Sequence, residues 1–492
     1  MTSPAKDPRI IIIGAGVAGI TAAHTFTQAG FRNITIAEKG ADVGGVWYWN
    51  HYPGLTCDVP SQIYQFGFAP KPDWSHLWAS GPEIQRYHRD VLERFGLDKY
   101  LRLNAEVVAA EYVSTDSGHQ WLVRLADGTI LEADFVFCAT GVLHHPSIPD
   151  IPGLDTFSGE VVHTARWDDS VATQGKRIAV LGTGSTGIQV VSALQREASH
   201  ISHFVRSPQW ILWAPMKLPQ PQAVAALLRR SPRAQDALYQ GLLSFSGVLA
   251  DLVLRPSWRR RAVQQYARLS LRTQVRDRAL REQLTPDYQP LCKRQVVSGT
   301  YYQAIQRPNA SLVTDQITEV TPTGITTADG RHHEVDLIVL ATGFKAHNYM
   351  RPMNIVGRDG ITLDDAWVKG PKAYRMTAIP GFPNLFTILG PNSPTGSISL
   401  QYSAEQTSKY LLHWLRAFAA GEVASAEVTA EATDRFNADV IDAMGPTVWN
   451  TGCNSWYLNP EDNTVDLWPY DRATLTSMLS TPDEADYRIE RL

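Results

Sequence analysis

A glycine fingerprint of the form GxGxxG occurs twice in this chain and constrains its fold more than any other feature. The first copy follows the apolar run 10–13, and the second follows the apolar run 178–181. Each copy then opens an apolar helical pattern, which predicts a strand, a tight turn and a helix whose N-terminus binds a dinucleotide pyrophosphate. One copy alone could be an ordinary glycine-rich turn, but two with matched spacing predict two such sites. The glycines are Gly14, Gly16 and Gly19 in the first copy and Gly182, Gly184 and Gly187 in the second.

The residue nineteen positions after the last glycine differs between the two copies. It is Glu38 in the first copy and Arg206 in the second. A carboxylate at the end of the second strand accepts hydrogen bonds from free ribose hydroxyls, whereas a guanidinium there suits a 2′-phosphate. We therefore predict FAD at the first site and NADPH at the second. Further contacts to NADPH are predicted around the second fingerprint from Thr183, Ser185, Thr186 and Gln189.

Length and charge restrict the partners of the chain. Its 492 residues suffice for two or three domains, and its formal net charge is only −4. We therefore expect small-molecule partners rather than nucleic acid or an anionic membrane. The apolar run from Gly241 to Leu254 contains Asp251 and is too short to span a bilayer, so no stable membrane insertion is expected. No heptad repeat is evident, which leaves the oligomeric state open.

Four cysteines are scattered along the chain without a CxxC pair. This spacing argues against a disulfide framework, a zinc site or a dithiol redox centre, and no metal is expected. A reducing, cytoplasmic location is predicted. The cysteines are Cys57, Cys138, Cys292 and Cys453.

The order of motifs predicts an α/β protein with two Rossmann-like domains and a helical insertion. A buried strand ending in ATG precedes a proline-rich connection near residue 150, and the strand-then-ATG pattern recurs at 336–344. The arginine-rich insertion is expected to present a solvated helix face rather than to meet a membrane or partner. The predicted ranges are 1–150 and 341–492 for the FAD domain, 151–210 and 291–340 for the NADPH domain, and 211–290 for the insertion.

Two longer patterns resemble the fingerprints of the type I Baeyer–Villiger monooxygenases, a family of class B flavoprotein monooxygenases. Residues 157–168 read FSGEVVHTARWD and match FxGxxxHxxxW(P/D), and residues 44–58 read GGVWYWNHYPGLTCD and match (A/G)GxWxxxx(F/Y)P(G/M)xxxD. The resemblance continues through CKR (292–294), GPNSPTG (390–396) and the C-terminal NSWYLNPEDNTVDLWP, so it covers nearly the whole chain. One departure is His51, where the family more often has arginine.

The resemblance implies roles for particular residues. Arg294 corresponds to the active-site arginine and Asp58 to its ion-pair partner; without the family patterns the two would be predicted to form an ordinary salt bridge between domains. Lys293 joins Arg206 and Ser207 around the 2′-phosphate. The remaining residues are implied in FAD binding (Gly45, Trp47, Asp58, Tyr64, Val107 and Leu400), in coupling domain rotation to the position of NADPH (His163 and Trp167), and in a C-terminal substrate loop (Trp449 and Trp456).

The resemblance also implies the reaction. A C4a-peroxyflavin, stabilised by Arg294, attacks a ketone, and one oxygen atom of O2 is inserted to give an ester or lactone. The alternative within flavin chemistry is oxidation of a sulfur or nitrogen centre through the same intermediate. Two other classes are a flavin reductase or oxidase that never transfers oxygen, and a nucleotide-binding scaffold. The sequence does not identify the ketone.

Overall fold

The computed structural model describes residues 7–115, 118–393, 398–461 and 464–491. Two parallel five-stranded sheets form its centre, and their strand orders are β19-β7-β1-β2-β3 and β13-β10-β9-β17-β8. The first contains β1 (Ile10–Ile13), β2 (Ile34–Ala37), β3 (Leu101–Arg102), β7 (Phe135–Cys138) and β19 (Leu385–Thr387). The second contains β8 (Glu160–His163), β9 (Arg177–Leu181), β10 (His200–Phe204), β13 (Ala310–Val313) and β17 (Leu337–Leu340). The predicted α/β class with two Rossmann-like sheets is confirmed.

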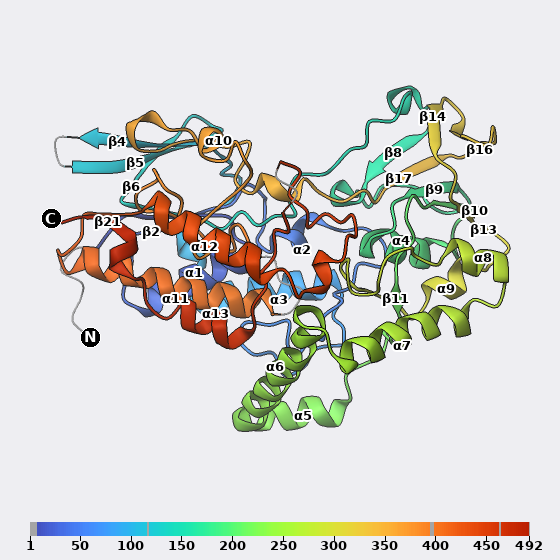
Figure 1. Ribbon diagram of the computed structural model, residues 1–492, viewed down its shortest axis with the longest axis horizontal. Helices are drawn as coiled ribbons and strands as arrows, with labels where there is room; N and C mark the ends of the chain where they lie inside the picture. The colour runs from blue at the N-terminus through green and yellow to red at the C-terminus, as the bar shows by residue number, and fades with distance from the viewer. Residues whose placement is uncertain (1–6, 116–117, 394–397, 462–463, 492) are drawn as a thin grey trace.

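The chain builds the first sheet, leaves it for the second, and then returns. After β7 it enters the second sheet at β8, and after β17 it comes back to the first at β19. Figure 1 shows the two sheets side by side, with the C-terminal helices on the side of the first. The two ATG segments occupy equivalent places, since each follows the strand that pairs with the fingerprint strand of its own sheet.

Helices cover the first sheet, and their buried faces consist of small and apolar side chains that pack together. α1 (Val17–Gln28) packs along α11 (Leu400–Ala419), and its fully buried Ala22 and Ala23 belong to the core that both helices share. Trp414 of α11 is buried in the same core. The other helices outside the insertion are α2 (Val46–Trp49), α3 (Gly81–Arg94), α4 (Ser185–Leu194), α9 (Tyr301–Ala304), α10 (Leu363–Ala366), α12 (Ala430–Ala443) and α13 (Arg472–Met478).

Three smaller sheets complete the body. One has the order β18-β4-β5-β6 and consists of β4 (Val107–Thr115), β5 (Gly118–Leu125), β6 (Ile130–Ala133) and β18 (Asn354–Val356). The second joins β14 (Ile317–Thr321), β15 (Gly324–Thr327) and β16 (His332–Glu334), and the third pairs β20 (Ser425–Val428) with β21 (Tyr487–Glu490).

The segment predicted as a helical insertion contains four helices, but it is not helical throughout. The helices are α5 (Gln222–Arg230), α6 (Pro232–Leu254), α7 (Trp258–Gln274) and α8 (Arg278–Gln283). Before them, β11 (Ile211–Leu212) pairs in parallel with β12 (Val296–Val297), which follows the helices. This two-stranded pair closes the base of the insertion, and two residues are too few to give an alternating pattern in the sequence.

α6 is longer than the apolar run that the sequence indicated. The Ser231 side chain accepts a hydrogen bond from the Ala234 N–H and caps the helix, Pro232 occupies its first position, and Pro256 follows its end. By length and composition alone, this helix of 23 residues is long and apolar enough to cross a membrane, and 35% of its apolar stretch is buried. The prediction that the run is too short therefore does not hold for the helix that contains it.

Candidate active site

The first fingerprint turn lies at the N-terminus of α1, and its glycines leave the backbone there uncovered by side chains. Gly14 has a φ of +104°, and a Cβ there would lie 2.7 Å from the Ala139 carbonyl oxygen. A Cβ on Gly19 would overlap the Gly14 carbonyl oxygen. Gly45 lies so close to Gly16 that a Cβ on it would be 3.0 Å from the Gly16 Cα. Such a turn lets a pyrophosphate approach the N–H groups of the helix, which fits the predicted dinucleotide.

Glu38 directly follows β2 and lies beside this turn. Its buried carboxylate accepts hydrogen bonds of 2.8 Å from the backbone N–H groups of Ala15 and Gly40. An ionised carboxylate has about four lone-pair positions, so capacity remains for ribose hydroxyls. Glu38 therefore has a task that the sequence did not indicate, because it holds together the two turns that flank the first nucleotide site.

The other residues predicted to contact FAD come from separate elements. Trp47 of α2 donates from Nε1 to the Tyr64 hydroxyl at 2.9 Å, and the two rings meet edge-on with centroids 5.5 Å apart. The structure thus brings these two aromatic residues together. Val107 is buried at the start of β4, whereas Leu400 begins α11 with its side chain exposed.

The second fingerprint repeats the geometry of the first. Gly182 has a φ of +117° and lies against the Ala341 carbonyl group, as Gly14 lies against Ala139. A Cβ on Gly187 would overlap the Gly182 carbonyl oxygen, whereas a Cβ on Gly184 would meet nothing within 4 Å. Gly184 is the N-cap of α4, and Ser185 is its first residue. This geometry fits the pyrophosphate of a second dinucleotide at the N-terminus of α4, as the first turn does at α1.

Basic side chains lie close together beyond the second turn, where β10 ends. Thr183 Oγ1 donates to the Ser207 carbonyl oxygen at 2.8 Å, and Lys293 Nζ lies 3.3 Å from Ser207 Oγ. Arg206 is exposed beside them, and burial together with the Arg206 charge lowers the pKa of Lys293. The structure thus joins residues nearly ninety positions apart into one cationic cluster that suits a phosphate group.

Hydrogen bonds connect α4 to the loop that carries Asp58. Gln189 Nε2 donates to the Thr56 carbonyl oxygen at 2.9 Å, and the Tyr52 hydroxyl donates to Gln189 Oε1 at 3.0 Å. The Thr186 hydroxyl lies 3.4 Å from the Tyr52 oxygen. Gln189 and Thr186, predicted only to contact NADPH, therefore also join the two nucleotide domains. Sequence reasoning missed Tyr52, although it occupies the (F/Y) position of the second family pattern.

Arg294 and Asp58 form the ion pair that the resemblance implied. Arg294 Nη2 donates to both carboxylate oxygens of Asp58 at 2.9 Å, and Nε donates to Oδ2 at 3.2 Å. The Asp58 charge raises the pKa of Arg294 above its ordinary value, so the guanidinium stays protonated at any working pH. The Arg294 side chain is 47% exposed and that of Asp58 is 15% exposed. Asp58 thus fixes the guanidinium while part of it stays accessible to a bound molecule.

Tyr457 is a further member of this site that sequence reasoning missed. Burial raises the pKa of its phenol to about 12, while the Arg294 charge acts in the opposite direction. Its ring lies 4.5 Å from that of Trp456 and 6.4 Å from that of Trp449. Trp449 is buried and Trp456 is exposed. The C-terminal segment therefore reaches the ion pair through Tyr457, the residue next to the predicted Trp456.

The structure corrects the prediction that the cysteines are not disulfide-bonded. Cys292 and Cys453 form a disulfide across a sequence separation of 161 residues. The bond joins the residue before Lys293 to the C-terminal segment, and the Thr451 hydroxyl lies 3.2 Å from Cys292 Sγ. The spacing of the cysteines could not indicate this bond, because its two loops meet only in the folded chain. Cys57 and Cys138 are free and buried, and burial raises the pKa of both thiols.

We predict that this cross-link contributes substantially to stability. Because it closes a long loop, Cys453→Ser should lower the free energy of unfolding by about 2–5 kcal/mol. The check is the thermal unfolding midpoint of the holoenzyme with and without dithiothreitol. Reductant should lower the midpoint of the wild type toward that of the variant and leave the variant unchanged. An equal shift in both proteins would contradict the prediction.

His163 and Trp167 lie at the edge of the second sheet, at the end of β8 and shortly after it. Nδ1 of His163, at the end of β8, accepts a hydrogen bond of 3.1 Å from the Ala165 N–H. Burial lowers the pKa of His163, so its ring is neutral near pH 7. Trp167 is buried in the core beside the second sheet. A neutral, buried ring is a poor proton donor, and the implied role of both residues in coupling domain rotation to the position of NADPH stays a prediction. Of the GPNSPTG segment, residues 394–396 lie outside the described residues.

Comparisons with known proteins agree with this geometry. Residues 7–245 match the flavin-binding monooxygenase-like family. The chain is 46% identical to an uncharacterized monooxygenase of Mycobacterium bovis over 98% of its length and 97% of that relative. It is 35% identical to a Baeyer–Villiger monooxygenase of Streptomyces coelicolor, over 98% of this chain and 93% of the relative. The crystal structure of OTEMO in complex with FAD and NADP superposes with a TM-score of 0.87 at 27% identity, covering 99% of this chain and 100% of that one.

Both nucleotide sites, the ion pair and the full-length similarity lead to one classification. FAD and NADPH are the cofactors, and the two glycine turns and the cationic cluster fit them. The chain belongs to the type I Baeyer–Villiger monooxygenases.

Proposed function

We propose that this protein uses NADPH and O2 to convert a ketone into an ester or lactone, with Arg294 and Asp58 as its catalytic residues. The observation that carries the proposal is the bidentate ion pair, in which Asp58 fixes a guanidinium that remains 47% exposed. Bound flavin supplies the redox chemistry, since it accepts hydride from NADPH and activates O2. The residues of the chain supply position and charge.

Arg294 is the group that stabilises negative charge on oxygen. A planar guanidinium offers several N–H donors at fixed angles, and a donor held in place costs no reorganisation when the charge develops. Asp58 occupies the Nε and Nη2 donors, which leaves Nη1 for the reacting oxygen. Tyr457 lies within electrostatic range of the pair, and its phenol, which stays protonated, contributes no competing negative charge.

The remaining site residues have binding roles in this proposal. Trp47 and Tyr64 shield the flavin from water, and Glu38 accepts hydrogen bonds from the FAD ribose. His163 and Trp167 hold the linker, and Trp449 and Trp456 line the substrate side of the C-terminal segment. Location in the cytoplasm stays a prediction, although the disulfide between Cys292 and Cys453 removes the argument from the cysteines, and cell fractionation will test it.

The experiment offers matched ketones and thioethers to the holoenzyme and quantifies product, NADPH and hydrogen peroxide. The proposal expects an ester or lactone in proportion to the NADPH consumed. Sulfoxide without ester would favour the heteroatom reaction. Complete conversion of NADPH into hydrogen peroxide with every substrate would contradict oxygen transfer altogether.

Arg206 should determine the preference for NADPH over NADH. Because a charge-assisted hydrogen bond contributes about 1.5–3 kcal/mol, Arg206→Gln should lower kcat/KM for NADPH by about 10- to 100-fold. The value for NADH should not change, since NADH has no 2′-phosphate. Steady-state kinetics with both coenzymes provide the test, and Arg278→Gln on α8 is the control. Equal losses of kcat/KM with NADPH and NADH would show that Arg206 does not bind the 2′-phosphate.

A further inference from the structure

The helical insertion presents large apolar side chains to solvent. Figure 1 shows α5 and α6 at one edge of the molecule, with α7 running from them beneath the second sheet. Leu227 and Phe245 are each 57% exposed, and Trp258 is 69% exposed. We refer to the exposed apolar side chains of these three helices as the arm surface. It consists of Val224 and Leu227 of α5, Phe245 and Val248 of α6, and Trp258 and Leu269 of α7.

The two sides of α6 have different surroundings. Tyr239 and Leu243 are buried and pack with Ile63, and Leu252–Leu254 enter the main core. Ala237, Gly241, Phe245 and Val248 follow one another at helical spacing on the opposite side and are exposed, although Gly241 is small and adds little apolar area. The stripe with Tyr239 and Leu243 thus packs on the rest of the protein, while the stripe with Phe245 and Val248 presents apolar surface to solvent.

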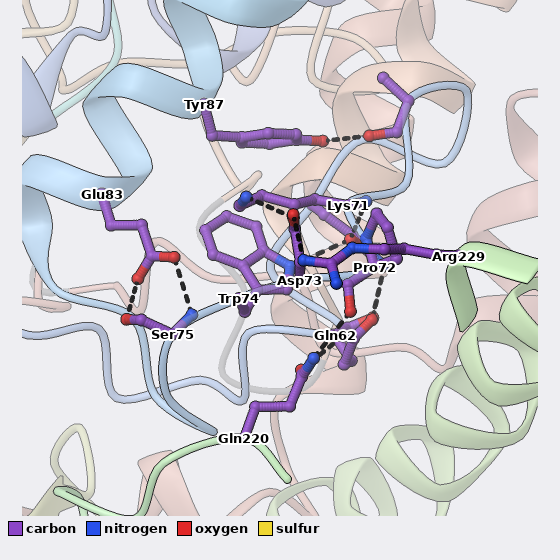
Figure 2. Close-up of polar contacts among 12 residues, drawn as sticks. Gln62, Lys71, Pro72, Asp73, Trp74, Ser75, Glu83, Tyr87, Gln220 and Arg229 are labelled. Carbon is purple, nitrogen blue, oxygen red and sulfur yellow. Dashed lines mark hydrogen bonds and ion pairs between the residues drawn. The ribbon is translucent and has the colours of Figure 1, made fainter. Parts of the chain in front are cut away.

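Polar contacts fix the insertion to the first nucleotide domain, as Figure 2 shows. Gln62 Nε2 donates to Gln220 Oε1 at 2.7 Å in a buried contact, and Gln220 Nε2 donates to the Pro72 carbonyl oxygen at 2.7 Å. Arg229 at the end of α5 pairs with Asp73 at 3.0 Å. The contacts lie on the protein side of the insertion, so they hold the arm surface outward.

The charge of the insertion is opposite to that of the rest of the chain. Between residues 211 and 290, thirteen side chains are basic and five are acidic, whereas the remaining chain has 32 basic and 44 acidic side chains. Exposed arginines lie at the ends of the three helices, next to the arm surface. They include Arg230, Arg233, Arg255, Arg259 and Arg261.

We propose that the arm surface binds an anionic lipid bilayer. Helices that lie in the membrane interface typically carry apolar and aromatic side chains flanked by arginines. Their rings enter the headgroup region, and their guanidinium groups contact phosphates. α6 lies along the bilayer rather than across it, because its stripe with Tyr239 and Leu243 remains packed on the protein. A two-fold contact with a second copy is disfavoured, since it would bring the same arginines against one another.

The test is flotation of the holoenzyme with two kinds of vesicle, one of phosphatidylcholine alone and one that also contains phosphatidylglycerol. We expect the enzyme to float with the second kind only, and less at high salt. Phe245→Ser combined with Trp258→Ser should lower the vesicle-bound fraction by at least about tenfold. Arg230→Gln and Arg233→Gln should each lower it by about fivefold.

Val368→Ser is the matched control. Val368 is 73% exposed, and it follows α10, which Figure 1 shows at the edge opposite α5 and α6. This variant should float like the wild type, and all variants should retain NADPH oxidation with ketone in the absence of vesicles. Lack of flotation, or flotation that survives the loss of Phe245 and Trp258, would overturn the proposal. So would light scattering that shows a dimer dissociated by the same two substitutions, because the arm surface would then join two copies.

Discussion

Replacing Arg294 with lysine is expected to lower the rate of ester formation by about 10²–10³-fold, while FAD remains bound. Lysine keeps the positive charge, but its ammonium group cannot donate to both oxygens of Asp58 and also present a fixed donor to substrate. NADPH consumption should then appear largely as hydrogen peroxide. The measurement is the ratio of ester to NADPH consumed, together with the flavin content of the purified variant.

This result separates a catalytic ion pair from a merely structural one. An exposed ion pair contributes only about 0–1 kcal/mol to stability, so a structural role predicts a small loss of stability and normal product yield. Arg278→Lys is the control, because Arg278 forms an exposed pair with Glu282 in the insertion. Near-normal ester formation by Arg294→Lys would refute the assignment of Arg294.

Gly19→Ala is expected to yield protein with less than about a tenth of the normal FAD content. The new Cβ would overlap the Gly14 carbonyl oxygen, and a backbone atom cannot turn aside as a flexible side chain does. Overpacking of this kind costs about 1–3 kcal/mol or more, and here it displaces α1 from the turn that binds the pyrophosphate. Flavin absorbance per protein measures the loss.

Gly187→Ala is the matched variant at the second site. It creates the same overlap with the Gly182 carbonyl oxygen, so it should retain FAD and lose reduction by NADPH. Retention of the Gly19→Ala protein on a 2′,5′-ADP resin would show that its second domain is folded. Gly241→Ala is the control, since a Cβ there meets nothing within 4 Å. Loss of FAD from Gly187→Ala but not from Gly19→Ala would reverse the assignment of the two sites.

The nucleotide sites could be predicted because their residues are linked by local geometry. Gly14 and Gly182 need positive φ angles, and Gly19 and Gly187 need the absence of a Cβ, so the spacing alone indicates the turn. Glu38, the acidic residue that belongs to the first turn, is also close to it in the sequence, because only α1 and β2 lie between them. The order of the motifs indicated two Rossmann-like sheets, whereas the number of strands in each came from the structure.

The residues that surround the ion pair could not be found in this way. The family pattern indicated Asp58, but nothing near it in the sequence identifies Tyr457 as a group near the pair or Gln189 as the partner of Thr56 in the same loop. The disulfide between Cys292 and Cys453 was excluded on spacing, yet it is present. Scattered cysteines carry a signal only when their partner is close in sequence.

The sequence by itself determined the two dinucleotide turns, their order along the chain and the choice of a carboxylate at one and a guanidinium at the other. These features depend on backbone sterics and charge within about forty residues. Only the tertiary structure decided which loops meet at Arg294, that Gln189 joins the two domains, and that the insertion presents an apolar, basic face. The physical reason is that these contacts join segments far apart in the chain, so they depend on how the domains pack rather than on any local preference.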